Sequence, residues 1–316
     1  MKNFADSLVR KIRELENPTV MGLDPRLEYI PEEIRNRWME TVGPDAELAA
    51  AMAIYEFNTT LIDAVCDIVP AIKPQFAYYE MYGVTGIETL KKTIAYAKSK
   101  GMLVIGDAKR NDIGSTATAY AEGIIGKTAL DDDSEKSMFN CDSVTVNGYL
   151  GIDGIKPFMD VCARDGKGIF TLVHTSNPSA VDFQDMELKD GRKVYELMAD
   201  NVNEWGKELI GEEGFSSVGA VLGATVPEQA VAARKRMPNT LMLVPGYGAQ
   251  GAGPDAAVAS FTKEGEGAIV NASRSLMCAW KKREDLAPAD YAKATRDEAL
   301  DMKAKLNEAL KDRKYV

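Results

Sequence analysis

The most constraining feature of this sequence is the alternation of short apolar runs with longer segments of helical periodicity. The runs are rich in Val, Ile and Leu, and they lack the polar alternation of half-exposed strands, which is typical of strands buried on both faces. Eight such runs occur, at residues 19–23, 71–73, 103–107, 143–146, 169–173, 218–222, 241–244 and 268–271. Because eight parallel strands, each leading into a helix, can close on themselves, the pattern predicts an α/β fold, a (β/α)8 TIM barrel.

The segments between the runs carry helical signals. Thr85-Gly-Ile-Glu88 and Thr225-Val-Pro-Glu228 have the spacing of capping boxes, which predicts that a helix begins at each of them. A buried helical face is predicted where apolar residues recur at the spacing i, i+3, i+4, i+7, at Ile155, Phe158, Met159 and Cys162.

The length of the chain is compatible with one barrel that carries loop insertions. The 316 residues exceed the roughly 250 of a typical barrel. The excess is expected at residues 28–48, at the acidic stretch 131–137 and at residues 177–192. No Pro- or Ser-rich linker divides the chain, so residues 1–316 are interpreted as a single domain. An open doubly wound sheet is the alternative, but no GxGxxG motif follows the first run to support its dinucleotide-binding form.

Composition excludes several classes of function. Lys and Arg number 38 against 48 Asp and Glu, a net charge of −10, and nucleic acid is therefore not expected as a partner. His174 is the only histidine and the four cysteines form no CxxC pair, which disfavours multi-histidine metal sites, zinc knuckles and dithiol centres. The N-terminus lacks a signal peptide and no run approaches the ~18 apolar residues of a membrane span, so we expect a soluble, cytoplasmic protein.

Charged side chains follow the second and third runs. Asp107 and Lys109 are two residues apart, so in an extended segment they face the same way, and Lys73 ends the adjacent run. Asp112 follows, and Gly114-Ser-Thr116 offers a helix start with capping hydroxyls. The cluster could be a structural network of ion pairs. Because desolvating several charges for structure alone is costly, a functional site is favoured.

A phosphate site is indicated after the last two runs. Gly246, Gly248 and Gly251 let backbone N–H groups approach an anion closely, and the Arg274 guanidinium can grip phosphate oxygens. The loops after strands seven and eight are the usual phosphate site of such barrels. Despite the acidic chain, Lys73, Lys109 and Arg274 would then converge in one cleft that favours an anionic substrate.

These motifs together resemble the orotidine 5′-phosphate decarboxylase family, in particular its longer bacterial and archaeal subgroup. The most specific match is Asp107-Ala-Lys-Arg-Asn-Asp-Ile-Gly-Ser-Thr116, which carries the DxKxxD signature of the family. The other matching segments occur in the expected order: Gly22-Leu-Asp-Pro-Arg26, Lys73-Pro-Gln75, Gly248-Ala-Gln-Gly251 and Asn271-Ala-Ser-Arg-Ser275. The resemblance implies a barrel that converts orotidine 5′-phosphate (OMP) to uridine 5′-phosphate (UMP) without a cofactor, the last step of de novo UMP synthesis. It also implies a homodimer with shared active sites.

The resemblance assigns roles to individual residues. It implies a catalytic array of Lys73, Asp107, Lys109 and Asp112, in which Lys109 protonates C6 of the pyrimidine and Asp112 enters the site of the neighbouring subunit. The implied substrate-binding residues are Asp24, Ile113, Thr116, Ser176, Gly248, Gln250, Gly251 and Arg274. Asp24 would contact the ribose, Ser176 the pyrimidine, and Gln250 and Arg274 the phosphate with help from the backbone of Gly248 and Gly251. Thr116 and Ile113 would line the site from the partner's loop.

Two residues depart from the family pattern, and two other functions compete with this interpretation. His174 precedes the Thr175-Ser176 pair and is expected to be structural or supporting, and Gly148 stands where relatives often have Pro. The first competing function is a Mg²⁺-dependent sugar-phosphate decarboxylase or hexulose-phosphate synthase, which needs an acidic metal ligand where this chain has Lys73. The second is a non-catalytic nucleotide-binding module, which would not require the full array.

Overall fold

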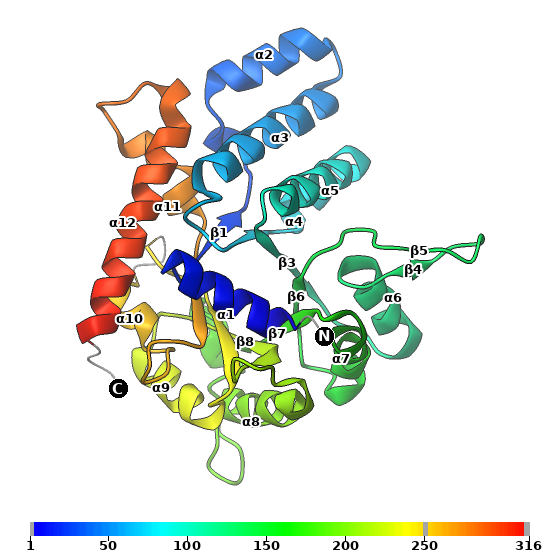
Figure 1. Ribbon diagram of the computed structural model, residues 1–316, viewed down its shortest axis with the longest axis vertical. Helices are drawn as coiled ribbons and strands as arrows, with labels where there is room; N and C mark the ends of the chain where they lie inside the picture. Colours follow the sequence, from blue (N-terminus) through cyan, green and yellow to red (C-terminus); the bar gives the residue numbers. More distant parts are fainter. Residues whose placement is uncertain (1–2, 249–251, 313–316) are drawn as a thin grey trace.

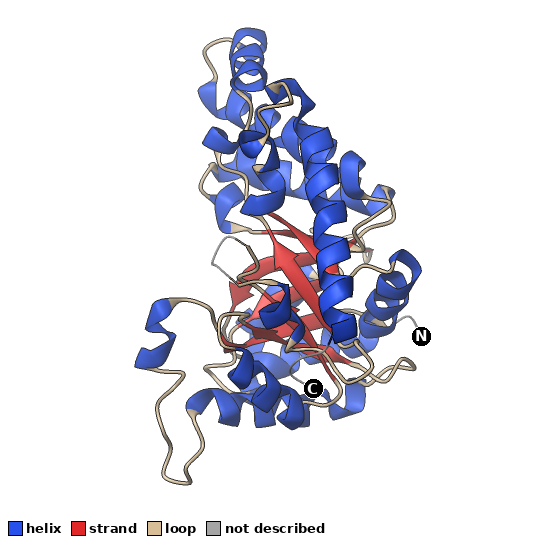
Figure 2. Cartoon of the chain, turned by 90° about the vertical axis from the view of Figure 1, so that its left-hand side faces the viewer, coloured by secondary structure: helices blue, strands red, loops and turns tan. Residues whose placement is uncertain are grey.

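The computed structural model describes residues 3–248 and 252–312, and a closed parallel barrel lies at its centre. Figure 2 shows the strands surrounded by helices. The barrel strands are β1 (Thr19–Leu23), β2 (Ala71–Pro74), β3 (Leu103–Arg110), β6 (Ser143–Val146), β7 (Gly168–His174), β8 (Ser216–Leu222), β9 (Thr240–Val244) and β10 (Ala268–Ala272). Their order around the barrel follows the chain, and β1 pairs with both β2 and β10. The predicted (β/α)8 barrel is confirmed.

Helices form the outer layer of the molecule (Figure 1). They are α1 (Phe4–Leu15), α2 (Glu32–Val42), α3 (Ala46–Val65), α4 (Ala77–Glu80), α5 (Gly83–Ser99), α6 (Gly114–Ile124), α7 (Ile152–Asp165), α8 (Val194–Gly206), α9 (Pro227–Arg236), α10 (Pro254–Val258), α11 (Arg274–Met277) and α12 (Tyr291–Asp312). Short 3-10 helices are η1 (Leu27–Tyr29), η2 (Pro178–Asp182), η3 (Lys207–Leu209), η4 (Ala279–Lys282) and η5 (Pro288–Asp290). Within the described ranges, no helix is long and apolar enough to cross a membrane.

Two hydrophobic cores result from strands that are buried on both faces. The larger core lies between the strands and the outer helices, and the smaller one joins inward-facing strand residues to α1. Phe4 of α1 meets Phe170 of β7 edge to face, with ring centroids 5.9 Å apart. A Cβ at Gly168 would lie 2.2 Å from the Phe4 ring, so glycine is what allows this contact. Helix α1 therefore covers the amino-terminal end of the barrel and leaves the other end for a site.

The three predicted insertions are separate pieces of structure. Residues 28–48 contain α2 and the first residues of α3, which form a helical pair at the top of Figure 1. Residues 131–137 form the turn and second strand of an antiparallel hairpin, β4 (Thr128–Ala129) with β5 (Glu135–Lys136), which was not among the predicted strands. Residues 177–192 contain η2 and an irregular segment that leads into α8.

The predicted helix caps were wrong, although helices do occur at these places. Helix α5 begins at Gly83 without a side-chain cap, and the Thr85 hydroxyl instead donates a hydrogen bond to Glu47 Oε1 at 2.5 Å. Helix α9 starts with Pro227 in its first turn, where the missing N–H costs nothing, and it also lacks a side-chain cap. Helix α6 begins at Gly114 as expected, but its capping position is Ile113 rather than a hydroxyl residue. The buried face of α7 is confirmed, with Met159 partly buried.

Candidate active site

The carboxyl ends of β2 and β3 bring a lysine and an aspartate together. The two strands are parallel neighbours, and an isolated bridge between Gln75 and Asp107 extends their pairing to this end. Lys73 Nζ lies 2.6 Å from Asp107 Oδ2. Lys73 is only 4% exposed and Asp107 6%, so this ion pair is removed from bulk water. The predicted proximity of these residues is confirmed.

Lys109 joins the same carboxylate from the other side, through a distorted backbone. Its Nζ lies 2.6 Å from Asp107 Oδ1, and its side chain is 45% exposed. The expectation of a regular extended strand was wrong here: Lys109 has φ of +47°, and the pairing of β3 with β6 shifts between Gly106 and Arg110. A non-glycine residue in the left-handed region is costly and is often found at functional sites. The distortion places the Lys109 ammonium at the mouth of the barrel.

Thr145 of β6 completes the cluster and was missed in the sequence. Its hydroxyl donates to Asp107 Oδ1 at 2.9 Å and accepts from the backbone N–H of Lys109 at 3.0 Å. One buried side chain therefore holds both the carboxylate and the distorted backbone in place. A polar residue within the otherwise apolar end of run 143–146 was the available signal.

The charges stabilise one another's ionised forms. Burial alone would raise the pKa of Asp107, but the ammonium groups of Lys73 and Lys109 outweigh it and hold that pKa below its ordinary range. Burial would lower the pKa of Lys73, yet the negative charges of Asp107 and Asp24 raise it. Lys73 and Asp107 therefore stabilise each other's charged form within the buried site.

Asp24 lies beyond the end of β1 with a carboxylate oxygen turned inward. Within the described residues, Asp24 Oδ1 and Asn271 Oδ1 are buried without a hydrogen-bond partner. Buried acceptors of this kind are normally satisfied, so they suit the hydroxyl groups of a bound ligand. Gly22 lets Ser273 and the Asn271 side chain approach β1 closely, because a Cβ at Gly22 would lie 1.9 Å from Ser273 Oγ and 3.0 Å from Asn271 Oδ1.

Asp112, Ile113 and Thr116 lie in the connection from β3 to α6 and at its start. Asp112 Oδ1 accepts a hydrogen bond from the Ile113 backbone N–H at 2.8 Å. Ile113 is 53% exposed, and Thr116 is also exposed. Of the four predicted catalytic residues, the structure thus joins Lys73, Asp107 and Lys109 in one cluster, whereas Asp112 bonds within its own loop.

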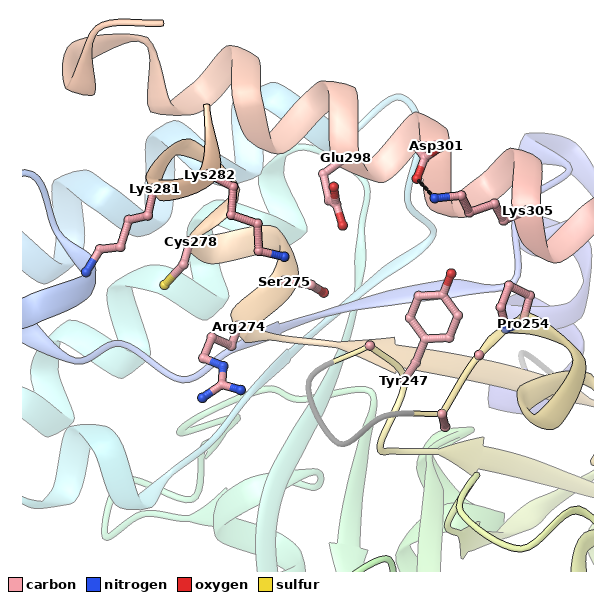
Figure 3. Close-up of a pocket in the computed structure, with 13 residues that line it drawn as sticks. Tyr247, Pro254, Arg274, Ser275, Cys278, Lys281, Lys282, Glu298, Asp301 and Lys305 are labelled. Carbon is pink, nitrogen blue, oxygen red and sulfur yellow. Dashed lines mark ion pairs between the residues drawn. The ribbon is translucent and has the colours of Figure 1, made fainter. Parts of the chain in front are cut away.

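The predicted phosphate end borders a cavity of about 680 Å³. Gly248, with φ of +71°, and Arg274 both line it. Figure 3 shows Arg274 and Lys282 on one side and the Tyr247 hydroxyl pointing toward α12. The lining carries four basic side chains (Arg274, Lys281, Lys282 and Lys305) and two acidic ones (Glu298 and Asp301), and this excess of cations suits an anionic group. Gln250 and Gly251, the other two predicted phosphate residues, lie outside the described residues.

Ser176 and His174 lie at the end of β7. Ser176 is partly buried against β8, since a Cβ at Gly223 would lie 2.9 Å from its backbone nitrogen. His174 is buried, its Nε2 lies 3.5 Å from Asp185 Oδ1, and it meets the Tyr195 ring edge to face at 5.0 Å. Burial lowers the pKa of His174 despite the nearby carboxylate. These contacts support the expected structural role of the only histidine.

Comparison with known proteins decides the family. A model of the orotidine 5′-phosphate decarboxylase / HUMPS family matches residues 46–287. The chain belongs to this family. An orotidine 5′-phosphate decarboxylase from Rhodopirellula baltica is 42% identical to this chain. The alignment covers 92% of this chain and 93% of the relative. Another relative of that name, from Caldicellulosiruptor saccharolyticus, is 37% identical, and the alignment covers 98% of this chain and 100% of that relative.

Solved structures agree with membership of the orotidine 5′-phosphate decarboxylase / HUMPS family. The Leishmania donovani OMP decarboxylase structure covers 96% of this chain and 99% of its own, with a TM-score of 0.68 and 27% identity. A Plasmodium berghei orotidine 5′-monophosphate decarboxylase has a TM-score of 0.76 over 98% of this chain and 99% of its own. At 19% identity, the second likeness concerns the fold alone.

Proposed function

We propose that this chain decarboxylates OMP to UMP, the last step of UMP synthesis, without a cofactor. The observation that carries the proposal is the Lys73–Asp107–Lys109 cluster at the barrel mouth, in which a buried Lys73–Asp107 pair meets the half-exposed Lys109 and both lysine nitrogens lie 2.6 Å from the shared carboxylate. The names of the relatives support this reaction. A module that only binds nucleotides would not need such a costly array of desolvated charges.

Lys109 is suited to the central step. When the bond between C6 and the carboxylate breaks, CO₂ leaves and the electron pair remains on C6, where no carbonyl can delocalise it. A nearby ammonium stabilises that carbanion electrostatically and then donates its proton, which leaves a neutral amine for solvent to reprotonate. The exposed position of Lys109 at the mouth allows both functions.

Asp107 acts mainly by holding Lys109 in position. Repulsion between its carboxylate and that of the substrate is weakened, because Asp107 is already paired with two ammonium groups. A single unit-charge interaction at 4 Å is worth ~4 kcal/mol at an effective dielectric of ~20. Enzymes that reduce barriers by ~20 kcal/mol need more than one such contact. Binding energy from the rest of the substrate supplies the remainder.

The rest of the substrate has candidate partners around the mouth. Arg274 and Gly248, together with Gln250 and Gly251, would hold the phosphate, which is consistent with the basic cavity that the first two line. Asp24 and Lys73 would hold the ribose hydroxyls, because Asp24 Oδ1 is a buried acceptor without a protein partner among the described residues. Ser176 would hydrogen-bond the pyrimidine.

A homodimer with shared sites is part of the proposal. Several large apolar side chains are exposed after β2, β3 and β6: Met81, Val84, Ile113, Tyr149 and Leu150. Exposed large apolar side chains, where they form one continuous patch, mark interfaces between proteins. Asp112, Ile113 and Thr116 follow β3, and Ile113 and Thr116 are exposed, which is consistent with their contribution to the site of a second copy.

The decisive experiment is an assay of purified protein with OMP in EDTA, followed by loss of absorbance. We expect turnover to UMP, because the mechanism uses lysines and aspartates alone. Turnover that appears only after Mg²⁺ is added would favour a metal-dependent enzyme of the same barrel group, and no turnover at all would refute the reaction. Lys73, paired with Asp107, occupies the place where a metal enzyme would need an acid.

The shared site has its own test. Asp112→Asn and Lys109→Ala homodimers should both be inactive. Mixing the two should restore activity through hybrid dimers in which one of the two sites has both native residues. Subunit exchange demonstrated by mass spectrometry without any return of activity would refute the shared site.

A further inference from the structure

The insertion at residues 177–192 contains a side chain that grips the loop after β7. The Gln184 amide makes two hydrogen bonds with Thr175: its Oε1 accepts from the Thr175 backbone N–H at 2.8 Å, and its Nε2 donates to the Thr175 hydroxyl at 2.8 Å. That hydroxyl in turn donates to Asn177 Oδ1 at 2.5 Å. One amide thus hydrogen-bonds both the backbone N–H and the hydroxyl of the residue directly before Ser176.

The backbone of Gln184 is itself tied to two elements of the fold. Its carbonyl accepts from the Tyr195 backbone N–H at the start of α8 (3.0 Å), and its N–H donates to the Ala180 carbonyl of η2 (2.8 Å). Side-chain contacts made from a fixed backbone carry less entropic cost, so they define position well. Gln184 therefore connects the β7 loop to a helix of the outer layer.

Ser176 is limited from the opposite side by β8 and its following turn. The His174 carbonyl accepts from the Gly223 backbone N–H at 2.9 Å, and Gly223 leaves room for the Ser176 backbone. The pairing of β7 with β8 shifts register between Leu172 and His174, so regular strand pairing alone does not determine where Ser176 lies. Contacts outside the sheet have to do so.

We propose that Gln184 is a positioning residue for recognition of the pyrimidine, because it holds Thr175 and thereby orients Ser176. Asp185 reinforces the same segment, since it lies 3.5 Å from His174 Nε2 and accepts hydrogen bonds from Lys193 Nζ and Gln229 Nε2. The insertion at residues 177–192 thus holds the loop after β7, which contains Ser176, in position. This inference rests on the proposed contact between Ser176 and the pyrimidine.

The variant that tests the role of Gln184 is Gln184→Met, which keeps the length of the side chain and removes both hydrogen bonds to Thr175. A cavity of about 260 Å³ borders Gln184, so the replacement does not disturb a tightly packed core. Binding of UMP and of ribose 5-phosphate would be measured by calorimetry. We expect the Kd of UMP to rise about tenfold, the scale of one to two hydrogen bonds, with no change for ribose 5-phosphate.

Two further variants separate positioning from a general structural effect. Gln184→Glu keeps the acceptor for the Thr175 N–H and should recover part of the UMP affinity. Thr175→Val removes the hydroxyl from the other side and should show the same selective loss, which also carries the test should Gln184→Met fail to fold. Lys189→Ala, in the exposed part of the same insertion, is the matched control and should bind both ligands normally.

The results separate this inference from the proposed reaction. Unchanged UMP affinity in the folded Gln184→Met variant, or an equal loss for both ligands, overturns the role of Gln184. The titrations do not depend on turnover. A wild-type protein that binds UMP but leaves OMP intact would overturn the proposed decarboxylation alone.

Discussion

Two buried cations at different places in the barrel are stabilised in different ways. Lys73, at the carboxyl end of β2, has a carboxylate partner in Asp107. Arg234, near the end of α9, has as its hydrogen-bond acceptors among the described residues only backbone carbonyl oxygens, at 2.7 to 3.3 Å. The acceptors are Ser260, Met237, Pro238, Thr240 and Gly267, which lie in the segments that lead into β9 and β10.

The difference shows what each cation is for. Carboxylate charges raise the pKa of Lys73, whereas burial lowers that of Arg234 to about 9, so both remain cations at neutral pH. Backbone carbonyl groups accept the hydrogen bonds of the Arg234 guanidinium without adding a negative charge. These hydrogen bonds are sufficient to join the loops that lead into β9 and β10. A carboxylate, by contrast, can hold two ammonium groups side by side for chemistry. In barrels of this type the carboxyl end carries the reaction and the amino end carries stability.

The largest effect that tests this contrast is expected at the reactive end. Lys109→Ala should reduce kcat by at least about 10⁴-fold, because proton donation and carbanion stabilisation are lost together. Its side chain is 45% exposed, so the free energy of unfolding should change by less than about 1 kcal/mol. Single-turnover kinetics and chemical denaturation check both values. A loss of activity below tenfold would remove Lys109 from the mechanism.

At the amino end the expected effect is on stability alone. Arg234→Met leaves several buried carbonyl groups without a donor and should lower the free energy of unfolding by about 3–5 kcal/mol, with kcat per folded molecule unchanged. The matched control is Arg236→Met on the same helix, whose guanidinium pairs with Asp200 and Glu196 near the surface. That change should cost less than about 1 kcal/mol. Reduced kcat in folded Arg234→Met would break the contrast.

The pH dependence of the free energy of unfolding tests the ion pair of Lys73 with Asp107, which Arg234 lacks. Asp107→Asn removes a carboxylate whose pKa is lowered by its lysine partners, and it should destabilise the protein by roughly 3 kcal/mol at pH 7. A lowered pKa gives stability that is present above the unfolded pKa, ~3.9, and is lost as the pH falls through the folded value. The difference in free energy of unfolding between wild type and variant should therefore be constant from pH 5 to 8, and it should become smaller only below about pH 4. Denaturation at each pH measures it, and narrowing already at pH 6 would contradict the assignment.

The smallest expected effect is at Thr145. Thr145→Val keeps the shape of the side chain but removes the hydroxyl that holds Asp107 and the Lys109 backbone. We expect a loss of about 1 kcal/mol in stability and a fall in kcat of less than about tenfold. Unaltered kcat would show that the ion pairs alone position Lys109.

The sequence predicted most of the fold and part of the site. All eight strand positions follow from hydrophobic patterning, because strands buried on both faces must be apolar throughout. The helix caps could not be predicted in the same way, since Thr85 finds a partner in Glu47, which lies 38 residues earlier in the chain. The β4–β5 hairpin was missed because its two-residue strands carry no periodic signal.

By itself, the sequence determined the barrel and the end at which the charged residues gather, since both depend on local pattern and on where strands end. Only the tertiary structure decided how those residues meet. The left-handed backbone of Lys109, the hydroxyl of Thr145 and the grip of Gln184 on Thr175 all depend on neighbours that are distant in the chain or on distorted pairing. Such contacts leave no periodic trace in the sequence, because their free energy comes from the arrangement of the folded elements.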